Sequence, residues 1–482
     1  MAITPKINGS LKESGDLFTL PKDRLSAKGA TEKALVLAER LQRLPGYENL
    51  ELAPVDSAEA TLEIAFAEGP EGGYKLKVEQ EKVTVEAYGE EGAANALATL
   101  YWMLRDGKGT ASGCEIIDIP ECGYRGFEID SSRHFFDTDT VKSMIEQLSL
   151  RKMNRLHWHL SDDQGYRVES KAFPSLNSIS SYRIEEDGNK YGGYYTQEQI
   201  KEIVSYAKAR GIEIIPEIDV PGHVVSILAA YPNLSCRELP IAVTPKFGVM
   251  KTVFCAGKDE ALDFAIKVID EVAGLFPFEY FHTGGDEVPK DEWKACPHCQ
   301  ERIKKEVLAD EEELQSWFAE KIIGRLRELG KTSICWNDAL VSGKQSDDII
   351  IQYWREQGTY CSDELKKGRK WIYSCFSNFY LDYTPDVTPL RTAFAFKPVL
   401  NSGELLTKET GLLGFEAELW SEWIPTKVRL EQMAFPRIFA LADRAWNGSD
   451  SYVEFLERCN KEVERLREDG IACFSMEEAD PE

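Results

Sequence analysis

The chain has 482 residues, of which 43% are hydrophobic and 11% aromatic. This composition can bury a full core over two or three domains, and it excludes an intrinsically disordered chain. The formal net charge of -25 argues against nucleic acid or an anionic membrane as a partner, because either would repel so acidic a surface.

The sequence also carries expectations about location. Its first residues, MAITPKINGSLKESGDLF, lack the apolar stretch of a secretory signal, and no apolar run of about 18 residues follows. The eleven cysteines are odd in number and stand in apolar contexts such as those of Cys335 and Cys375. This favours buried free thiols over a disulfide framework. We therefore expect a cytoplasmic protein, unless a signal peptide has been removed.

Residues 1–122 predict a small α+β domain. Helices are expected at 32–44 and 91–104, where apolar residues recur at helical spacing. Strand-like segments lie at 60–67, 73–78 and 82–87. The stretch 106–122 is rich in glycine and is the natural linker to the next domain.

Residues 123–482 predict an α/β domain, because short apolar runs recur with helical segments between them. The eight expected strands are 125–129, 155–160, 213–218, 280–283, 333–336, 349–354, 371–375 and 414–418. A capping box at Thr196 and Gln199 begins one helix, which Gly211 ends. A last amphipathic helix over 452–467 packs outside. Eight such strands predict a (β/α)8 TIM barrel with its active site at their C-terminal ends.

Polar and aromatic residues gather just after these expected strands. They are Asp130, Arg133, Asp162, Asp163, Asp219, His223, Asp286, Glu287, Trp336, Asp338, Trp354, Asn378, Tyr380, Asp382, Trp420 and Glu422. Sugars offer hydroxyl groups to charged side chains and flat apolar faces to aromatic rings. Carboxylates, an arginine and aromatic rings around one opening therefore indicate a sugar pocket.

The segment Phe281-His-Thr-Gly-Gly-Asp-Glu287 is the most specific feature. Its glycines let the backbone turn at the strand end, and the side chains of Asp286 and Glu287 can then point at different parts of one ligand. Adjacent acids repel when both ionise, which raises the pKa of one of them and keeps it protonated, as a general acid requires. The plain alternative is a helix N-terminus enriched in acids.

Eight motifs carry a family resemblance: GFEIDSSRHF, HWHLSDDQG, PEIDVPGH, HTGGDE, WND, QYW, NFYLDY and ELWSE. With these motifs in the family order, the chain resembles glycoside hydrolase family 20, the β-N-acetylhexosaminidases, over nearly its whole length. The resemblance implies retaining exo-hydrolysis of terminal β-linked N-acetylglucosamine or N-acetylgalactosamine from a small glycan, without a cofactor. It also implies that the substrate's 2-acetamido oxygen is the nucleophile and forms an oxazolinium intermediate, an exception to the rule of two enzyme carboxylates.

The same resemblance implies a role for each site residue. Glu287 would protonate the leaving oxygen and then activate water, Asp286 would accept from the acetamido N–H and stabilise positive charge, and Tyr380 would donate to the acetamido oxygen. The expected substrate-binding residues are Arg133, Asp162, His223, Trp336, Trp354, Asp382, Trp420 and Glu422. The three tryptophans would enclose the acetamido methyl group, and Arg133, Asp382 and Glu422 would hold the outer hydroxyls. His159 and His282 would support the site from behind, and His282, with Asp162 and His223, would orient Asp286.

Two other enzyme classes stay open on the sequence. A lacto-N-biosidase-type glycosidase shares this scaffold and releases a disaccharide. A metal-dependent amide hydrolase would use zinc ligands drawn from His157, His159, His223, His282 and Asp338. The second is disfavoured, because the H-x-H pair follows the second strand and no bridging lysine stands at a suitable strand end.

Cys296-Pro-His-Cys299 suggests half of a zinc knuckle. No second pair of cysteines or histidines follows at ligand spacing. We therefore interpret the segment as a turn that begins a helix and happens to carry two thiols, and we expect no metal.

Overall fold

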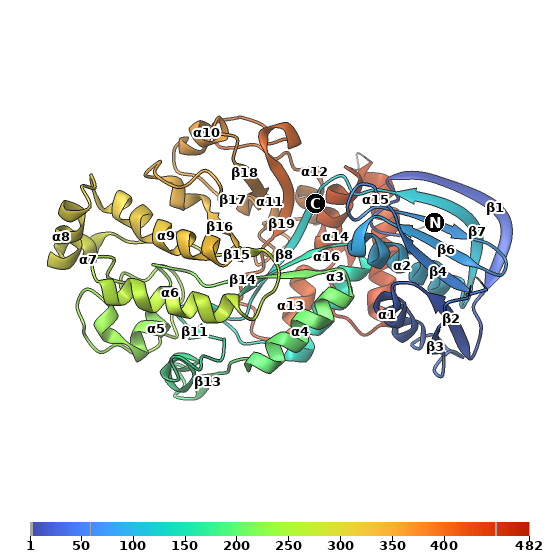
Figure 1. The fold of residues 1–482 in the computed structure, drawn as a ribbon, viewed down its shortest axis with the longest axis horizontal. Helices are drawn as coiled ribbons and strands as arrows, with labels where there is room; N and C mark the ends of the chain where they lie inside the picture. The colour runs from blue at the N-terminus through green and yellow to red at the C-terminus, as the bar shows by residue number, and fades with distance from the viewer. Residues whose placement is uncertain (1–2, 58, 449–450, 482) are drawn as a thin grey trace.

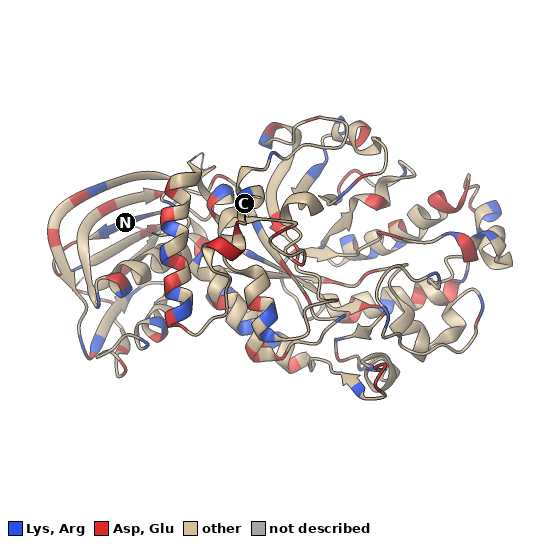
Figure 2. Ribbon diagram, turned by 180° about the vertical axis from the view of Figure 1, so that it is seen from behind, with Lys and Arg blue, Asp and Glu red and all other residues tan. Residues whose placement is uncertain are grey.

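The computed structural model describes residues 3–57, 59–448 and 451–481. Figure 1 shows an N-terminal sheet with its helices lying beside a barrel whose strands are surrounded by helices. Acidic and basic residues are interspersed along the helices of both parts (Figure 2). Within the described residues, no helix combines the length and the apolar character that crossing a membrane requires.

The N-terminal part is one seven-stranded mixed sheet with two helices. Its strands, in the order in which they lie side by side, are β1 (Gly9–Thr19), β7 (Thr110–Asp118), β5 (Tyr74–Val78), β6 (Val83–Ala87), β4 (Leu62–Phe66), β2 (Arg24–Lys28) and β3 (Glu51–Pro54). The helices are α1 (Thr31–Leu41) and α2 (Gly89–Asp106). Both predicted helices and the three predicted strands are confirmed within a few residues.

The predicted linker over 106–122 is wrong for most of its length. It contains β7, which pairs antiparallel with both β1 and β5. Its buried side chains alternate with more exposed ones, and Ala111 and Ile116 belong to the core of the sheet. The glycines made this strand look like a linker in the sequence. At Gly113 a glycine is needed because β1 is irregular opposite it, and a Cβ there would lie 2.4 Å from the Ser14 hydroxyl. The chain passes from sheet to barrel only over 119–123.

The second part is a closed barrel of eight parallel strands. They are β8 (Tyr124–Asp130), β9 (Arg155–His159), β14 (Glu213–Glu217), β15 (Tyr280–His282), β16 (Thr332–Trp336), β17 (Ile350–Tyr353), β18 (Lys370–Tyr373) and β19 (Leu412–Ala417). β19 pairs with β8 and so closes the barrel. All eight predicted strands are present, which confirms the TIM barrel.

Helices and short hairpins fill the connections between these strands, and further helices follow the last strand, β19. The longer helices are α3 (Thr138–Leu150), α4 (Gln197–Ala209), α6 (Asp259–Ala273), α8 (Pro297–Lys305), α9 (Glu311–Glu328), α13 (Lys427–Ala434), α14 (Ile438–Asn447) and α15 (Tyr452–Glu468). The shorter ones are α5 (Val225–Ala230), α7 (Asp291–Ala295), α10 (Tyr360–Leu365), α11 (Phe376–Phe379), α12 (Leu390–Ala395) and α16 (Met476–Ala479). Single turns lie at Leu176–Ser180, Pro232–Leu234, Asn337–Leu340 and Lys408–Thr410. The hairpins are β10 (Ser161–Asp162) with β11 (Gly165–Tyr166), and β12 (Tyr182–Ile184) with β13 (Lys190–Gly192). The capping box of α4 is as predicted, and the amphipathic helix predicted over 452–467 is α15, which a short helix, α16, follows.

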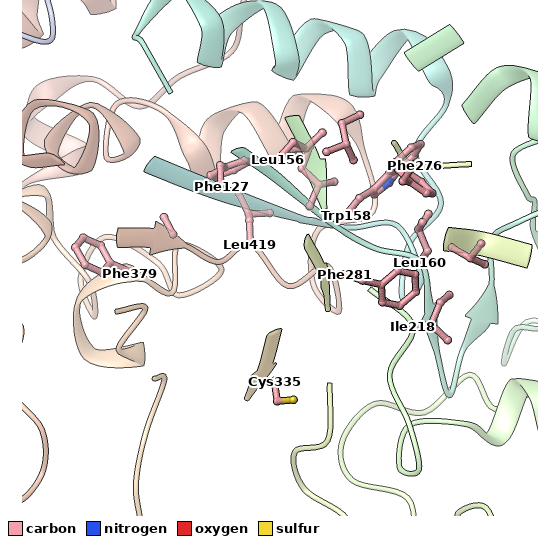
Figure 3. Packing of buried hydrophobic residues seen from close by; sticks show 14 of the residues in the cluster. Phe127, Leu156, Trp158, Leu160, Ile218, Phe276, Phe281, Cys335, Phe379 and Leu419 are labelled. Atoms are coloured by element: carbon pink, nitrogen blue, oxygen red, sulfur yellow. The ribbon is translucent and has the colours of Figure 1, made fainter. Parts of the chain in front are cut away.

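The alternation of side chains along each strand decides what faces the barrel interior. On β9, Leu156 and Trp158 belong to the large apolar core that also contains Phe127 and Phe281 (Figure 3). The intervening His157 and His159 are buried away from this core, in contact with Glu217 and other acids of the interior.

The floor of the barrel is apolar. Tyr124, Ile215, Ile334, Ile350 and Ile372 form a separate cluster from five strands. Because this layer closes the bottom, the polar side chains above it can be reached only from the C-terminal ends of the strands.

The two parts are held together by buried ionic contacts. Lys152, which follows α3, contacts the Asp118 carboxylate of β7 at 2.6 Å, and both side chains are buried. The Trp102 indole of α2 donates to the carbonyl of Leu150 at 2.9 Å. These contacts therefore hold the N-terminal sheet in a fixed position against the bottom and side of the barrel.

Candidate active site

The acid pair lies on the loop that leaves β15. Gly284 and Gly285 have φ values of 64° and 94°, and a Cβ on Gly284 would lie 1.8 Å from the Asp219 carboxylate. Glu287 itself has φ of 48°, a left-handed conformation that costs free energy in a residue with a side chain. The next helix, α7, begins only at Asp291. The alternative of a helix N-terminus is therefore wrong, and the loop holds Asp286 and Glu287 by backbone constraint.

Asp286 is the more enclosed of the two acids. Burial, with a smaller contribution from Asp338 and Glu287, raises the pKa of Asp286 to about 7, although His223 opposes the shift. Among the described residues, its Oδ1 atom has no hydrogen-bond partner. Burying an oxygen without a hydrogen-bond partner costs free energy, and such an oxygen can accept from a donor group on a ligand.

A chain of charged groups leads to this acid pair. The His223 Nε2 atom lies 3.9 Å from both the Asp286 and the Glu287 carboxylates. Its Nδ1 atom contacts Asp162 at 3.2 Å, and Asp162 also contacts Arg133 at 2.7 Å. Burial alone would raise the pKa of Asp162, but Arg133 and His223 outweigh it and hold that pKa well below its ordinary value. In turn, Asp162 raises the pKa of His223 against the effect of burial.

Glu287 has a cationic neighbour that the sequence did not identify. The Arg355 guanidinium donates to its Oε1 atom at 2.6 Å and lies 4.1 Å from the centre of the Trp354 ring. Arg355 is the second residue after β17 and follows Trp354. The position after a predicted strand was the only signal that could have found it.

Aromatic rings form one wall of the site. Trp354 and Tyr380 are nearly parallel at 6.0 Å between ring centres, and Tyr380 lies 6.3 Å from Trp420. The Trp354 indole donates to Asp338 at 2.8 Å. Trp336 lies deeper: it is 1% exposed, packs at 5.8 Å from Trp420, and donates to Glu217 at 3.0 Å.

A second charged group stands apart from the acid pair. Arg133 contacts Asp130 at 3.2 Å and lies over the Trp420 ring at 4.9 Å. Burial, helped by the Glu422 charge, raises the pKa of Asp382 to about 8. Burial also raises the pKa of Glu422, which Arg133 opposes. Two partly buried acids with raised pKa values beside one arginine can both accept from and donate to hydroxyl groups.

These groups surround one cavity of about 150 Å³. Its lining comprises Arg133, His159, Asp162, Asp219, His223, Asp286, Glu287, Trp354, Tyr380, Asp382, Tyr383, Trp420 and Glu422. Most predicted site residues are thus brought together. Trp336 and His282 stay outside the lining, beneath it, and Asp219 and Tyr383 line it without having been assigned a role.

A larger cavity of about 490 Å³ adjoins the first. Glu287 lines both cavities, and the outer one is also lined by Val249, Asp338, Arg355 and Tyr360. Glu287 therefore stands at the boundary between the smaller inner cavity and the larger outer one.

The ligand set of a metal-dependent amide hydrolase is not assembled. His157 and His282 stack at 4.6 Å and share Glu217, whereas His159 bonds to Glu217 and Asp162. Across the described residues, no group of neighbouring ligand atoms joins His157 and His159 to His223 or Asp338. The ligands expected for that alternative are therefore divided between separate groups.

Comparison with known proteins agrees with this geometry. Residues 122–449 match the model of the glycosyl hydrolase family 20 catalytic domain, and residues 1–119 match domain 2 of the same family. The chain belongs to glycosyl hydrolase family 20. The family resemblance read from the motifs is thereby confirmed.

Named relatives in this family are similar over most of the chain. A β-hexosaminidase of Porphyromonas gingivalis is 36% identical over 96% of this chain, which spans 63% of that protein's length. A family 20 exo-β-N-acetylglucosaminidase of Vibrio harveyi, solved with N-acetylglucosamine, has a TM-score of 0.87 and 30% identity over 98% of this chain and 78% of its own. A β-N-acetylhexosaminidase of Bacteroides fragilis has a TM-score of 0.86 and 29% identity, with 98% and 97% covered.

Proposed function

We propose that this family 20 protein is a retaining exo-β-N-acetylhexosaminidase, which removes terminal β-linked N-acetylglucosamine or N-acetylgalactosamine by substrate-assisted catalysis. The observation that carries the proposal is one cavity lined by Asp286 and Glu287, by Trp354, Trp420 and Tyr380, and by Arg133. The named relatives are consistent with it.

Asp286 is suited to steady the substrate's amide. Its unpartnered buried oxygen would accept from the acetamido N–H, and an opposite charge that develops nearby would stabilise its ionised form. Tyr380 would donate to the acetamido oxygen, and the aromatic wall would hold the methyl group close and exclude water. The oxygen would then attack the anomeric carbon, break its bond to the leaving oxygen, and close an oxazolinium ring.

Glu287 is suited to transfer the proton. It lies where the inner and outer cavities meet, so the bond between a sugar in the first and a leaving group in the second would cross in front of its carboxyl. It would protonate the leaving oxygen and then take a proton from the water that opens the oxazolinium ring. The product would keep the β configuration, because two successive displacements occur at the anomeric carbon and each inverts it.

The outer end of the chamber supports exo-action on a single sugar. Arg133 is buried, Asp382 and Glu422 are partly buried, and all three line the same cavity. They would hold the hydroxyls of a non-reducing terminal residue. A lacto-N-biosidase would need room for a second sugar beyond this point, and the cavity of about 150 Å³ favours one ring.

A panel of p-nitrophenyl β-glycosides tests the proposal. We expect turnover of the N-acetylglucosaminide, the N-acetylgalactosaminide or both, with the β-anomer as the first product seen by proton NMR. Turnover of the lacto-N-bioside alone, or a first product of α configuration, would contradict it.

Replacing Tyr380 with phenylalanine is expected to lower kcat about 10²-fold, because a donor to the reacting oxygen is lost while the stacked ring remains. Since binding of the unreacted sugar depends less on this bond, KM should change by less than about tenfold. Steady-state kinetics on the N-acetylglucosaminide measure both. An unchanged kcat would remove Tyr380 from the mechanism.

A further inference from the structure

Four cysteines from two separate segments of the chain converge beside the barrel mouth. Cys236 and Cys255 lie in the connection between α5 and α6, and Cys296 and Cys299 lie at the start of α8. All four sulfur atoms lie within 4.8 Å of one another, and Cys255, Cys296 and Cys299 are buried. The Cys255 sulfur is 3.6 Å from those of Cys296 and Cys299, and the sulfurs of Cys236 and Cys299 are 3.8 Å apart.

We propose that these four cysteines form a structural zinc site. Thiolates that bind Zn²⁺ tetrahedrally at about 2.3 Å are separated from one another by about 3.8 Å, close to the spacing observed. A disulfide would require about 2.05 Å between two of the sulfurs. Four cysteine ligands complete the coordination of the ion, so the site has a structural and not a catalytic role.

The surrounding backbone is built to hold this arrangement. Cys296 precedes the first residue of α8 and Cys299 lies in its first turn, where the positive end of the helix dipole stabilises thiolates. The Cys255 N–H donates to the Leu234 carbonyl at 2.9 Å. This bond holds the segment that carries Cys236 close to the segment that carries Cys255. A Cβ on Gly257 would lie 2.2 Å from the His298 carbonyl carbon, so glycine is required for this close approach.

The site fixes the wall of the outer cavity. It joins the long segment 231–258 to α8, which follows soon after Asp286 and Glu287 in the chain. The same segment meets the barrel mouth elsewhere: Gln164 donates to the Lys246 carbonyl at 2.7 Å, and Val249 lines the outer cavity with Glu287. Bound zinc would therefore set the position of the surface that meets the leaving group.

The sequence interpretation of Cys296-Pro-His-Cys299 was incomplete. The segment does begin a helix, as predicted. The other two ligands come from single cysteines on a preceding connection, so no second pair at close spacing marks them. Only the fold brings Cys236 and Cys255 to the helix.

Metal analysis of the purified full chain tests the site. The protein is produced in zinc-supplemented medium and purified without chelators or metal-affinity resin. Plasma mass spectrometry should find about one zinc per chain in the wild type, and below about a tenth of that in Cys299→Ser. The matched control is Cys361→Ser, which alters an equally buried thiol of α10 and should keep its zinc.

Two measurements on the wild type remain informative if Cys299→Ser does not fold. An organomercurial should release about one zinc per chain to a colorimetric indicator. Trypsin should cut at the exposed Lys251 and Arg237 faster once zinc has been removed, because their segment is freed from α8. A wild type with no bound metal, with iron in place of zinc, or with these cysteines paired in disulfides by mass spectrometry would overturn the proposal. Zinc retained in Cys299→Ser would overturn it too.

Discussion

Replacing Glu287 with glutamine should reduce kcat on a disaccharide of N-acetylglucosamine by about 10²- to 10⁴-fold, the range that general acid catalysis supplies. Glutamine keeps the size of the side chain and can still accept from Arg355, so the pocket should bind sugar as before. The loss should shrink on a dinitrophenyl glycoside, whose leaving group needs no proton. Initial rates on the two substrates and isothermal titration with N-acetylglucosamine measure these effects.

Glu312→Gln is the matched control. This carboxylate lines the outer cavity but pairs with Lys290 at 3.3 Å. Its replacement should leave kcat within about threefold, as expected for a surface substitution. If Glu287→Gln kept wild-type rates on the disaccharide, or lost the same factor on both substrates, Glu287 would not be the proton donor.

Replacing Asp286 with asparagine should lower kcat by about 10²- to 10³-fold, because a neutral amide cannot stabilise the positive charge that develops on the ring. The effect should not depend on the leaving group, which separates it from the loss at Glu287. Asp291→Asn changes an exposed acid of α7 and should have no effect. We expect Asp286→Asn to lose the same factor in kcat on good and poor leaving groups, and we do not expect this of Glu287→Gln.

The pH dependence follows from the raised pKa of Asp286. Burial brings that pKa to about 7 in the free enzyme, and lower pH protonates the carboxylate that catalysis needs. The value of kcat/KM should therefore fall below about pH 7. In the complex, the acetamido N–H favours the charged form, so kcat should hold to lower pH. In Asp286→Asn, the fall of kcat/KM at low pH should disappear. If the fall persisted in this variant, it would arise from the titration of another group.

The barrel was predictable because its strands are short, mostly buried runs that recur with helical segments between them. The segment 155–160 could be read as a strand from Leu156 and Trp158, and the structure has β9 at Arg155–His159. The N-terminal sheet was harder. Strand β1 is exposed along most of its length, so its sequence has no apolar alternation to detect, and its partner β7 was mistaken for a linker.

The candidate site was predictable where residues lie within four positions after the end of a strand. Asp286, Trp354 and Trp420 all do, and they line the inner cavity. Contacts that depend on the rotation of a side chain were not predictable. Arg355 pairs with Glu287, and Trp336 points below the cavity to Glu217, because of packing that no spacing in the sequence records.

The central claim is that the substrate's own amide is the nucleophile. It is tested most directly by p-nitrophenyl β-N-acetylglucosaminides whose acetyl group carries none, one, two or three fluorine atoms. Fluorine withdraws electrons from the carbonyl oxygen that would attack. We predict that kcat falls steeply at each step along this series, while KM changes little. Rates that are independent of fluorination would contradict the account.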